Sequence, residues 1–283
     1  MKLRSFSHCI PAAFVLCIAD STFNATAQQS NAEATNHIET ASSEAGMTGL
    51  SATGGREARF RLLQDKMDSL KGNAARSWDG YEQVVREMMA EFPRRPEGYQ
   101  NLMVMIQLGE REKAKVLAKE MAESSAPEHF RSWARGFLHR ADSIGKPLTI
   151  KFTSLDGREV DTAKLKGKVV LIDFWATYCG PCVAALPEIK STYDKFHSQG
   201  FEVIGISLDI DKSKAMDFIK QKGLPWPQYF DGKRGADHKL AQELGIVAIP
   251  HTMLLDKKGC LRLDHFLNGS QIERHVTRLL SEP

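Results

Sequence analysis

The chain has 283 residues, with 38 Lys and Arg against 35 Asp and Glu, and a formal net charge of +3. This balance favours no particular polyanionic partner. No basic stripe with interleaved aromatic residues is present, so we do not expect the chain to bind nucleic acid. Hydrophobic residues make up 42% and charged residues 26% of the chain, which is typical of a soluble globular protein with room for more than one domain.

The first 27 residues have the features of a secretory signal peptide. Lys2 and Arg4 precede an apolar run at 9–19, and Ala25-Thr26-Ala27 forms a small-x-small cleavage site. The apolar run is too short to span a bilayer stably, so we expect cleavage and no integral membrane span in the mature chain. The alternative is an uncleaved membrane anchor. Both interpretations predict that the protein is exported.

The next two segments differ sharply in composition. Residues 28–55 are rich in Ser, Thr, Ala, Asn and Gly, which predicts a flexible linker. From 56 to 143, apolar residues recur at helical spacing and predict a small all-α domain of about five short helices. We interpret its Met-rich stripe as core, with partner docking as the alternative. Gly145-Lys146-Pro147 marks the boundary with the last predicted domain, residues 144–283.

In the last domain, strand and helix patterns alternate. Residues 168–173 form an apolar run that predicts a buried strand, and residues 224–227, with two prolines, predict a rigid turn. Helical patterns follow the strand at four places, namely 183–196, 214–222, 238–244 and an amphipathic stretch at 271–280. This alternation favours an α/β domain built around a mixed sheet.

Two cysteines, separated by Gly180-Pro181, lie between the predicted strand and the helix that follows it. Cys179 falls just before the first helical turn, where free N–H groups and the helix dipole favour a thiolate. Pro181 suits a first helical turn, and Gly180 lets a partner's backbone approach. We therefore expect Cys179 to be the attacking thiol and Cys182, more buried, to resolve the mixed disulfide. Their spacing allows a disulfide with little backbone strain.

Two other interpretations of the cysteine pair remain open. It could be half of a zinc site, although no second Cys-x-x-Cys and no close His pair accompanies it. It could also be an inert structural disulfide of an exported protein. Cys260 follows Lys257-Lys258-Gly259, a turn about six residues past Pro250, or ~20 Å along the strand at ~3.3 Å per residue. That is too far to join the Cys-x-x-Cys pair without a large movement, so we expect Cys260 to be a free or partly buried thiol.

From about residue 145 to its end, the chain resembles thioredoxin-like proteins, specifically the exported TlpA/ResA-type redoxins. The motif Cys179-Gly180-Pro181-Cys182, followed later by Ile249-Pro250, carries the resemblance. By the same resemblance 152–160 is the family's first hairpin, 200–209 a parallel strand and 253–259 the closing hairpin. It implies a thioredoxin-like α/β fold, with a mixed central sheet flanked by helices, after the small all-α domain.

The resemblance also implies roles for individual residues. Pro250 would follow a cis peptide bond that faces the sulfurs and offers backbone groups to a substrate strand. Asp173 matches the buried acid that moves the proton of the resolving cysteine, because burial raises a carboxyl pKa; the alternative is an acid satisfied by local hydrogen bonds. The implied catalytic set is Cys179, Cys182, Asp173 and Pro250, with Cys179 and Cys182 forming the redox disulfide. The implied substrate-binding set is Trp175, Tyr178, Gly180, Pro181 and Ile249.

Two positions near the motif depart from the family pattern, and a third, His251, has two interpretations. Tyr178 stands where the family usually has Trp, and Ala185 where many members carry Glu. His251 follows Pro250 and is interpreted as a residue on the surface of a strand, with tuning of the thiolate as the alternative.

The implied activity is thiol–disulfide exchange with no bound cofactor or metal, in the bacterial periplasm or cell envelope. A Gly-Pro pair resembles that of thioredoxin, whose potential near roughly −270 mV favours a reductant. The partners would be protein disulfides, with cytochrome apoproteins as one candidate, and a membrane thiol–disulfide electron donor. One alternative is a thiol peroxidase, whose Pro-x-x-x-Thr/Ser-x-x-Cys context is missing before Cys179. The other is a non-enzymatic protein-binding module on a redoxin scaffold.

Overall fold

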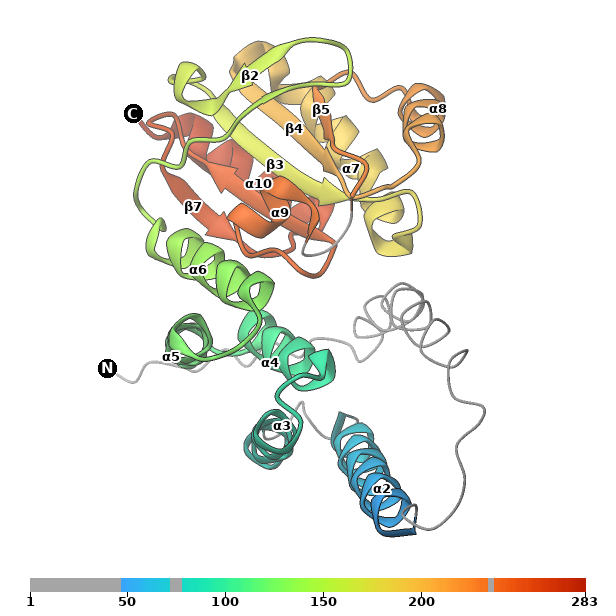
Figure 1. Ribbon diagram of the computed structural model, residues 1–283. Helices are drawn as coiled ribbons and strands as arrows, with labels where there is room; N and C mark the ends of the chain where they lie inside the picture. The colour runs from blue at the N-terminus through green and yellow to red at the C-terminus, as the bar shows by residue number, and fades with distance from the viewer. Residues whose placement is uncertain (1–46, 72–77, 234–236) are drawn as a thin grey trace, which may run out of the picture. The chain divides into compact units, whose positions relative to one another are not determined.

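The computed structural model describes residues 47–71, 78–233 and 237–283 (Figure 1). The chain divides into two compact units, and the division falls inside one helix, between Leu102 and Met103. The predicted signal peptide lies outside the described residues, as does the predicted linker up to residue 46. The predicted domain boundary at 143/144 stays a prediction.

The first unit contains helices α2 (Met47–Lys71) and α3 (Asp79–Glu91) and the beginning of α4 (Pro96–Leu108). The apolar positions that recur at helical spacing are buried, as predicted, among them Leu63 and Met67 of α2 and Met88 of α3. The ring of Phe60 meets Phe92 edge to face at a centroid distance of 5.2 Å. The buried methionines belong to the core of this unit.

Helix α2 corrects part of the predicted linker. It begins at Met47, so residues 47–55 are helical, although their composition predicted a flexible segment. A helix that is already nucleated gains one backbone hydrogen bond for each residue it adds. The amphipathic segment from Phe60 onward therefore extends toward the N-terminus through residues of weak helix propensity.

The second unit begins with the end of α4 and continues with α5 (Arg111–Glu123) and α6 (Glu128–Asp142), which pack together. These helices complete the set predicted from the apolar spacing. Trp133 of α6 is fully buried, and its ring stacks on Phe137 one turn later. This apolar face fixes α6 against its neighbours.

A five-stranded mixed sheet forms the centre of the second unit. It consists of β3 (Val169–Trp175), β4 (Phe201–Ser207), β5 (Gln228–Phe230), β6 (His251–Leu255) and β7 (Leu261–Asp264). The strand order is β5-β4-β3-β6-β7, with β3 parallel to β4 and antiparallel to β6. The predicted mixed sheet and the strands β3 and β4 are confirmed. The short strand β5, directly after the predicted turn, was not predicted.

A separate hairpin of β1 (Lys151–Thr153) and β2 (Glu159–Asp161) precedes the sheet. It leads into the short 3₁₀ helix η2 (Thr162–Lys164) and confirms the hairpin expected at 152–160. A second 3₁₀ helix, η3 (His197–Gln199), joins the helix after β3 to β4.

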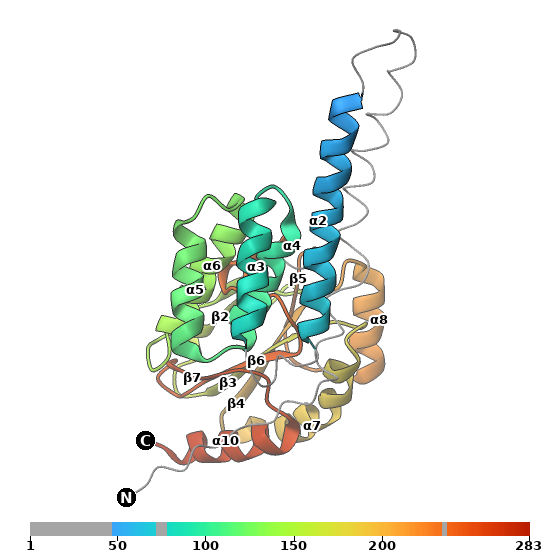
Figure 2. The same cartoon turned by 90° about the horizontal axis from the view of Figure 1, so that it is seen from below.

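Four helices complete this unit, namely α7 (Gly180–Phe196), α8 (Lys212–Lys222), α9 (Lys239–Glu243) and α10 (Gly269–Ser281). Helices α7 and α10 lie side by side along one face of the sheet, whereas α5 and α6 lie on its other side (Figure 2). Helix α6 also packs against α9. Among the described helices, none is long and apolar enough to cross a membrane.

The sheet brings two sequence motifs to one edge. All seven residues of β3 are buried, as expected for a central strand covered on both faces. Phe174, near the carboxyl end of β3, pairs with His251, the first residue of β6. The turn that follows β3 and carries Cys179 therefore lies at the same edge as the segment that precedes β6 and carries Pro250.

The contact between α6 and the loop after α9 predicts a difference between two glycine substitutions. Gly245 has a φ of +62°, and a Cβ added there would collide with the backbone of Phe137 in α6. Gly259 has a φ of +79° with no atom near its missing Cβ. Gly259→Ala should cost about 1 kcal/mol of unfolding free energy, from backbone strain alone. Gly245→Ala should cost about 3 kcal/mol or more, because overpacking adds to the strain.

Chemical denaturation of both variants measures this difference. Equal losses would mean that α6 does not hold this loop closely.

Candidate active site

The two cysteines of the Cys-x-x-Cys motif form a disulfide at the start of α7, with an S–S distance of 2.03 Å. Cys179 is the N-cap residue of α7, and its Sγ accepts a hydrogen bond from the backbone N–H of Cys182 at 3.2 Å. The predicted position just before the first helical turn is thus confirmed. Once reduced, a Cys179 thiolate at this position is stabilised by the free N–H groups of the helix start.

The burial of the two sulfurs differs from the prediction. Cys179 is 0% exposed and Cys182 is 3% exposed, so the expectation that Cys182 is the more buried is wrong for this structure. Tyr178 and Gly180, on either side of Cys179, are exposed and form the accessible rim of the motif. Pro181 is half-buried.

Asp173 lies in the middle of β3, between Gly205 of β4 and Thr252 of β6. Its side chain is buried, and burial raises the pKa of Asp173 to about 7. The direction agrees with the expectation from the sequence. A carboxyl group with such a pKa can both accept and return a proton at neutral pH.

The peptide bond between Ile249 and Pro250 is cis, as the resemblance implied. Both residues are half-buried, directly before β6. The next residue, His251, corrects an expectation: it is buried rather than on the surface of the strand. Its Nε2 lies 2.8 Å from Oδ1 of Asp264, and burial lowers the pKa of His251.

Trp175 also needs a correction. The sequence placed it among the substrate-binding residues, but its side chain is fully buried. Its indole N–H donates to Oε1 of Gln228 at 3.0 Å, and its ring packs near Phe218 of α8. Trp175 therefore packs in the core, where its hydrogen bond to Gln228 supports the turn that follows β3.

Asp209 is a residue of this site that sequence reasoning missed. Its buried carboxylate accepts hydrogen bonds from the backbone N–H of Thr177 at 3.1 Å and from the Thr177 hydroxyl at 2.6 Å. Ser207 donates to the same carboxylate at 2.8 Å. Asp209 thus ties the turn before Cys179 to the end of β4. The sequence could have indicated Asp209 by its position, directly after a strand that runs parallel to β3. Parallel neighbouring strands end at the same edge of a sheet, so their carboxyl ends lie close together.

Cys260 is a free, half-buried cysteine, as predicted. Within the described ranges, no group of three or more His, Cys, Asp or Glu side chains is arranged to hold a metal ion.

Comparison with known proteins places the second unit in a family. The Redoxin family model matches residues 141–273. The chain is 30% identical to the thiol-disulfide oxidoreductase ResA of Halalkalibacterium halodurans, over 44% of this chain and 68% of that protein. This chain is a thiol–disulfide oxidoreductase of the redoxin family.

Two further proteins are similar to this chain. The chain is 35% identical to the thiol:disulfide interchange protein DsbE of Yersinia pestis, over 43% of this chain and 63% of the relative. Among solved structures, the thioredoxin domain of a thiol-disulfide oxidoreductase from Bacteroides vulgatus is 27% identical, with a TM-score of 0.42. The alignment covers 47% of this chain and 94% of the chain in that structure.

The raised pKa of Asp173 predicts how the stability of this redoxin depends on pH. The unfolded chain loses this proton near pH 4, whereas the folded chain keeps it up to about pH 7. Between these values the folded state binds more protons, so the unfolding free energy falls as pH rises. Asp173→Asn should remove this fall and stabilise the oxidised protein at pH 8 by on the order of 4 kcal/mol.

Denaturation at pH 4 and at pH 8 tests this expectation, with wild type and Asp173→Asn compared at each pH. The two proteins should differ little at pH 4. An unchanged difference between them at the two pH values would show that Asp173 does not titrate in this range.

Proposed function

We propose that this redoxin acts outside the cytoplasm as a reductant of protein disulfides, with Cys179 as the attacking thiol and Cys182 as the resolving thiol. The observation that carries the proposal is the Cys179–Cys182 disulfide at the N-terminus of α7. A helix start lowers the pKa of a thiol, and the exposed Tyr178 and Gly180 leave room for a partner beside it.

The reaction transfers two electrons from the dithiol to the substrate. The Cys179 thiolate attacks one sulfur of the substrate disulfide, forms a mixed disulfide and releases the first substrate thiolate. The Cys182 thiolate then attacks Sγ of Cys179, which releases the second substrate thiolate and forms the Cys179–Cys182 disulfide. The products are a reduced substrate and an oxidised redoxin.

Asp173 is proposed as the base for the resolving step. Cys182 starts as a buried thiol and has to lose its proton before it attacks. A carboxyl group whose pKa is about 7 would accept that proton at neutral pH without a large energetic penalty. Pro250 and Ile249 would contribute the surface against which the substrate backbone lies, together with Tyr178, Gly180 and Pro181.

The features of a secretory signal peptide in the N-terminal sequence support the proposed location. A signal peptide would export the chain to the bacterial periplasm or cell envelope, where a membrane thiol–disulfide donor would reduce it again. Cytochrome apoproteins are candidate substrates in that compartment, since they need reduced thiols for haem attachment.

Reduction of insulin disulfides, with dithiothreitol as the electron source, tests the roles of the cysteines. Cys179→Ser should lower the rate by roughly 100-fold or more, because the nucleophile is lost. Cys182→Ser, reduced first and then freed of dithiothreitol, should keep the first step and accumulate a mixed disulfide between Cys179 and insulin, visible by mass spectrometry. Cys260→Ser is the matched control and should retain the wild-type rate.

Activity that survives in Cys179→Ser would contradict the proposed role of this residue. Trapping of insulin on Cys182 in that variant would reverse the two roles.

A further inference from the structure

The backbone just before Pro250 is held by a glutamine from a helix outside the sheet. The side chain of Gln107, in the last turn of α4, bonds to the backbone of Val247 and Ala248 through both ends of its amide. Its Oε1 accepts from the N–H of Val247 at 3.1 Å and from the N–H of Ala248 at 3.2 Å. Its Nε2 donates to the carbonyl of Ala248 at 3.1 Å. The Gln107 amide therefore both accepts from and donates to the backbone of this segment, as the backbone of a neighbouring β-strand does.

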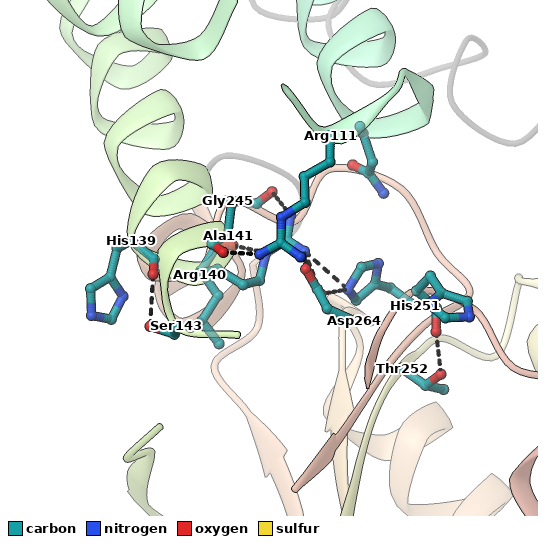
Figure 3. Close-up of polar contacts among 12 residues, drawn as sticks. Arg111, His139, Arg140, Ala141, Ser143, Gly245, His251, Thr252 and Asp264 are labelled. Atoms are coloured by element: carbon teal, nitrogen blue, oxygen red, sulfur yellow. Dashed lines mark hydrogen bonds and ion pairs between the residues drawn. The ribbon is translucent and has the colours of Figure 1, made fainter. Parts of the chain in front are cut away.

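An arginine from α6 holds the other end of the same segment. Arg140 is buried, and its Nε donates to the carbonyl of Leu244 at 2.6 Å. Its guanidinium also contacts the carbonyl of Gly245 and forms an ion pair with Asp264 of β7. Asp264 also contacts His251, the first residue of β6. Its ion pair with Arg140 therefore connects α6 to the start of that strand (Figure 3).

Close backbone packing joins these polar contacts. A Cβ added at Gly136 of α6 would collide with the carbonyl of Gln242, and one at Gly245 would collide with Phe137. Residues 242–251 are therefore fixed by α6 at one end and by Gln107 near the other. Ile249 and Pro250 lie between the Gln107 contacts and the buried His251.

We propose that Gln107 and Arg140 are positioning residues that hold the 244–251 segment so that the backbone of Ile249 is presented to a protein substrate. The inference rests on the proposed function, because it assigns these helical residues to substrate binding at the same site. Gln107 pairs with the N–H groups of Val247 and Ala248 and with the carbonyl of Ala248 from the helical side. The Ile249–Pro250 peptide follows these contacts directly and is the part of the segment that we assign to a substrate strand.

The proposal makes a distinction between two kinds of substrate. A protein disulfide gains affinity from backbone contacts beside its sulfurs, whereas a small aromatic disulfide has no peptide backbone to align. Loosening the segment should therefore weaken the binding of a protein substrate and leave sulfur chemistry intact. A residue that only stabilises the fold would affect both substrates alike.

Gln107→Met keeps the length of the side chain and removes all three hydrogen bonds, so it is the main test. In the full chain, KM for insulin should rise about 5-fold, since each lost hydrogen bond weakens the alignment, while kcat changes less than about 2-fold. The rate with 5,5′-dithiobis(2-nitrobenzoic acid) and the reduction potential should match those of the wild type. Gln100→Met, two turns earlier on the same helix, is the matched control and should behave as wild type.

Gln107→Glu provides a second variant that keeps an acceptor for the N–H groups of Val247 and Ala248 but places a carboxylate oxygen against the Ala248 carbonyl. It should also raise KM for insulin and leave the rate with the small aromatic disulfide unchanged, so it still tests the proposal if the Met variant does not fold. An unchanged KM in a folded variant would overturn the inference, as would equal losses with both substrates. If the wild type itself fails to reduce insulin, the proposed function falls and this inference falls with it.

Discussion

The turn between β3 and α7 is the constraint on which the rest of the redoxin unit depends. Within a few residues of the end of a fully buried central strand, this turn has to place Cys179 at the free N–H groups of a helix start. The chemistry needs this position because a thiolate is stabilised there and not in the core. The remaining features of the second unit either hold this turn in place or bring a second surface next to it.

Two loops meet at this edge, and each is held by a polar side chain from elsewhere in the unit. Asp209, after β4, accepts hydrogen bonds from the turn before Cys179. Gln107 and Arg140, from helices before the sheet, hold the segment before β6. A reactive edge built from loops needs such support, because loops lack the regular hydrogen bonds that fix strands and helices. The helical region of the second unit is in this sense part of the redoxin site.

Features that depend on local sequence could be predicted. The apolar run of β3, the Cys-Gly-Pro-Cys motif and the Ile-Pro dipeptide each carry their signal within a few residues. The residues that Asp209 and Gln107 contact are distant in the sequence, since Thr177 and Asp209 are 32 positions apart and Gln107 and Ala248 are 141 positions apart. A polar residue that bonds to distant backbone has no periodicity to reveal it. For the same reason His251 was expected at the surface: its partner Asp264 lies on another strand.

Whether the Cys179/Cys182 pair acts as a reductant is decided by its reduction potential. This potential can be measured in glutathione buffers by thiol alkylation, with Cys260→Ser to remove side reactions. We expect a reversible two-electron couple at roughly −270 mV, as for a reductant. A value near roughly −120 mV would reverse the direction of electron flow, and the absence of any reversible cycle would contradict thiol–disulfide exchange at this site.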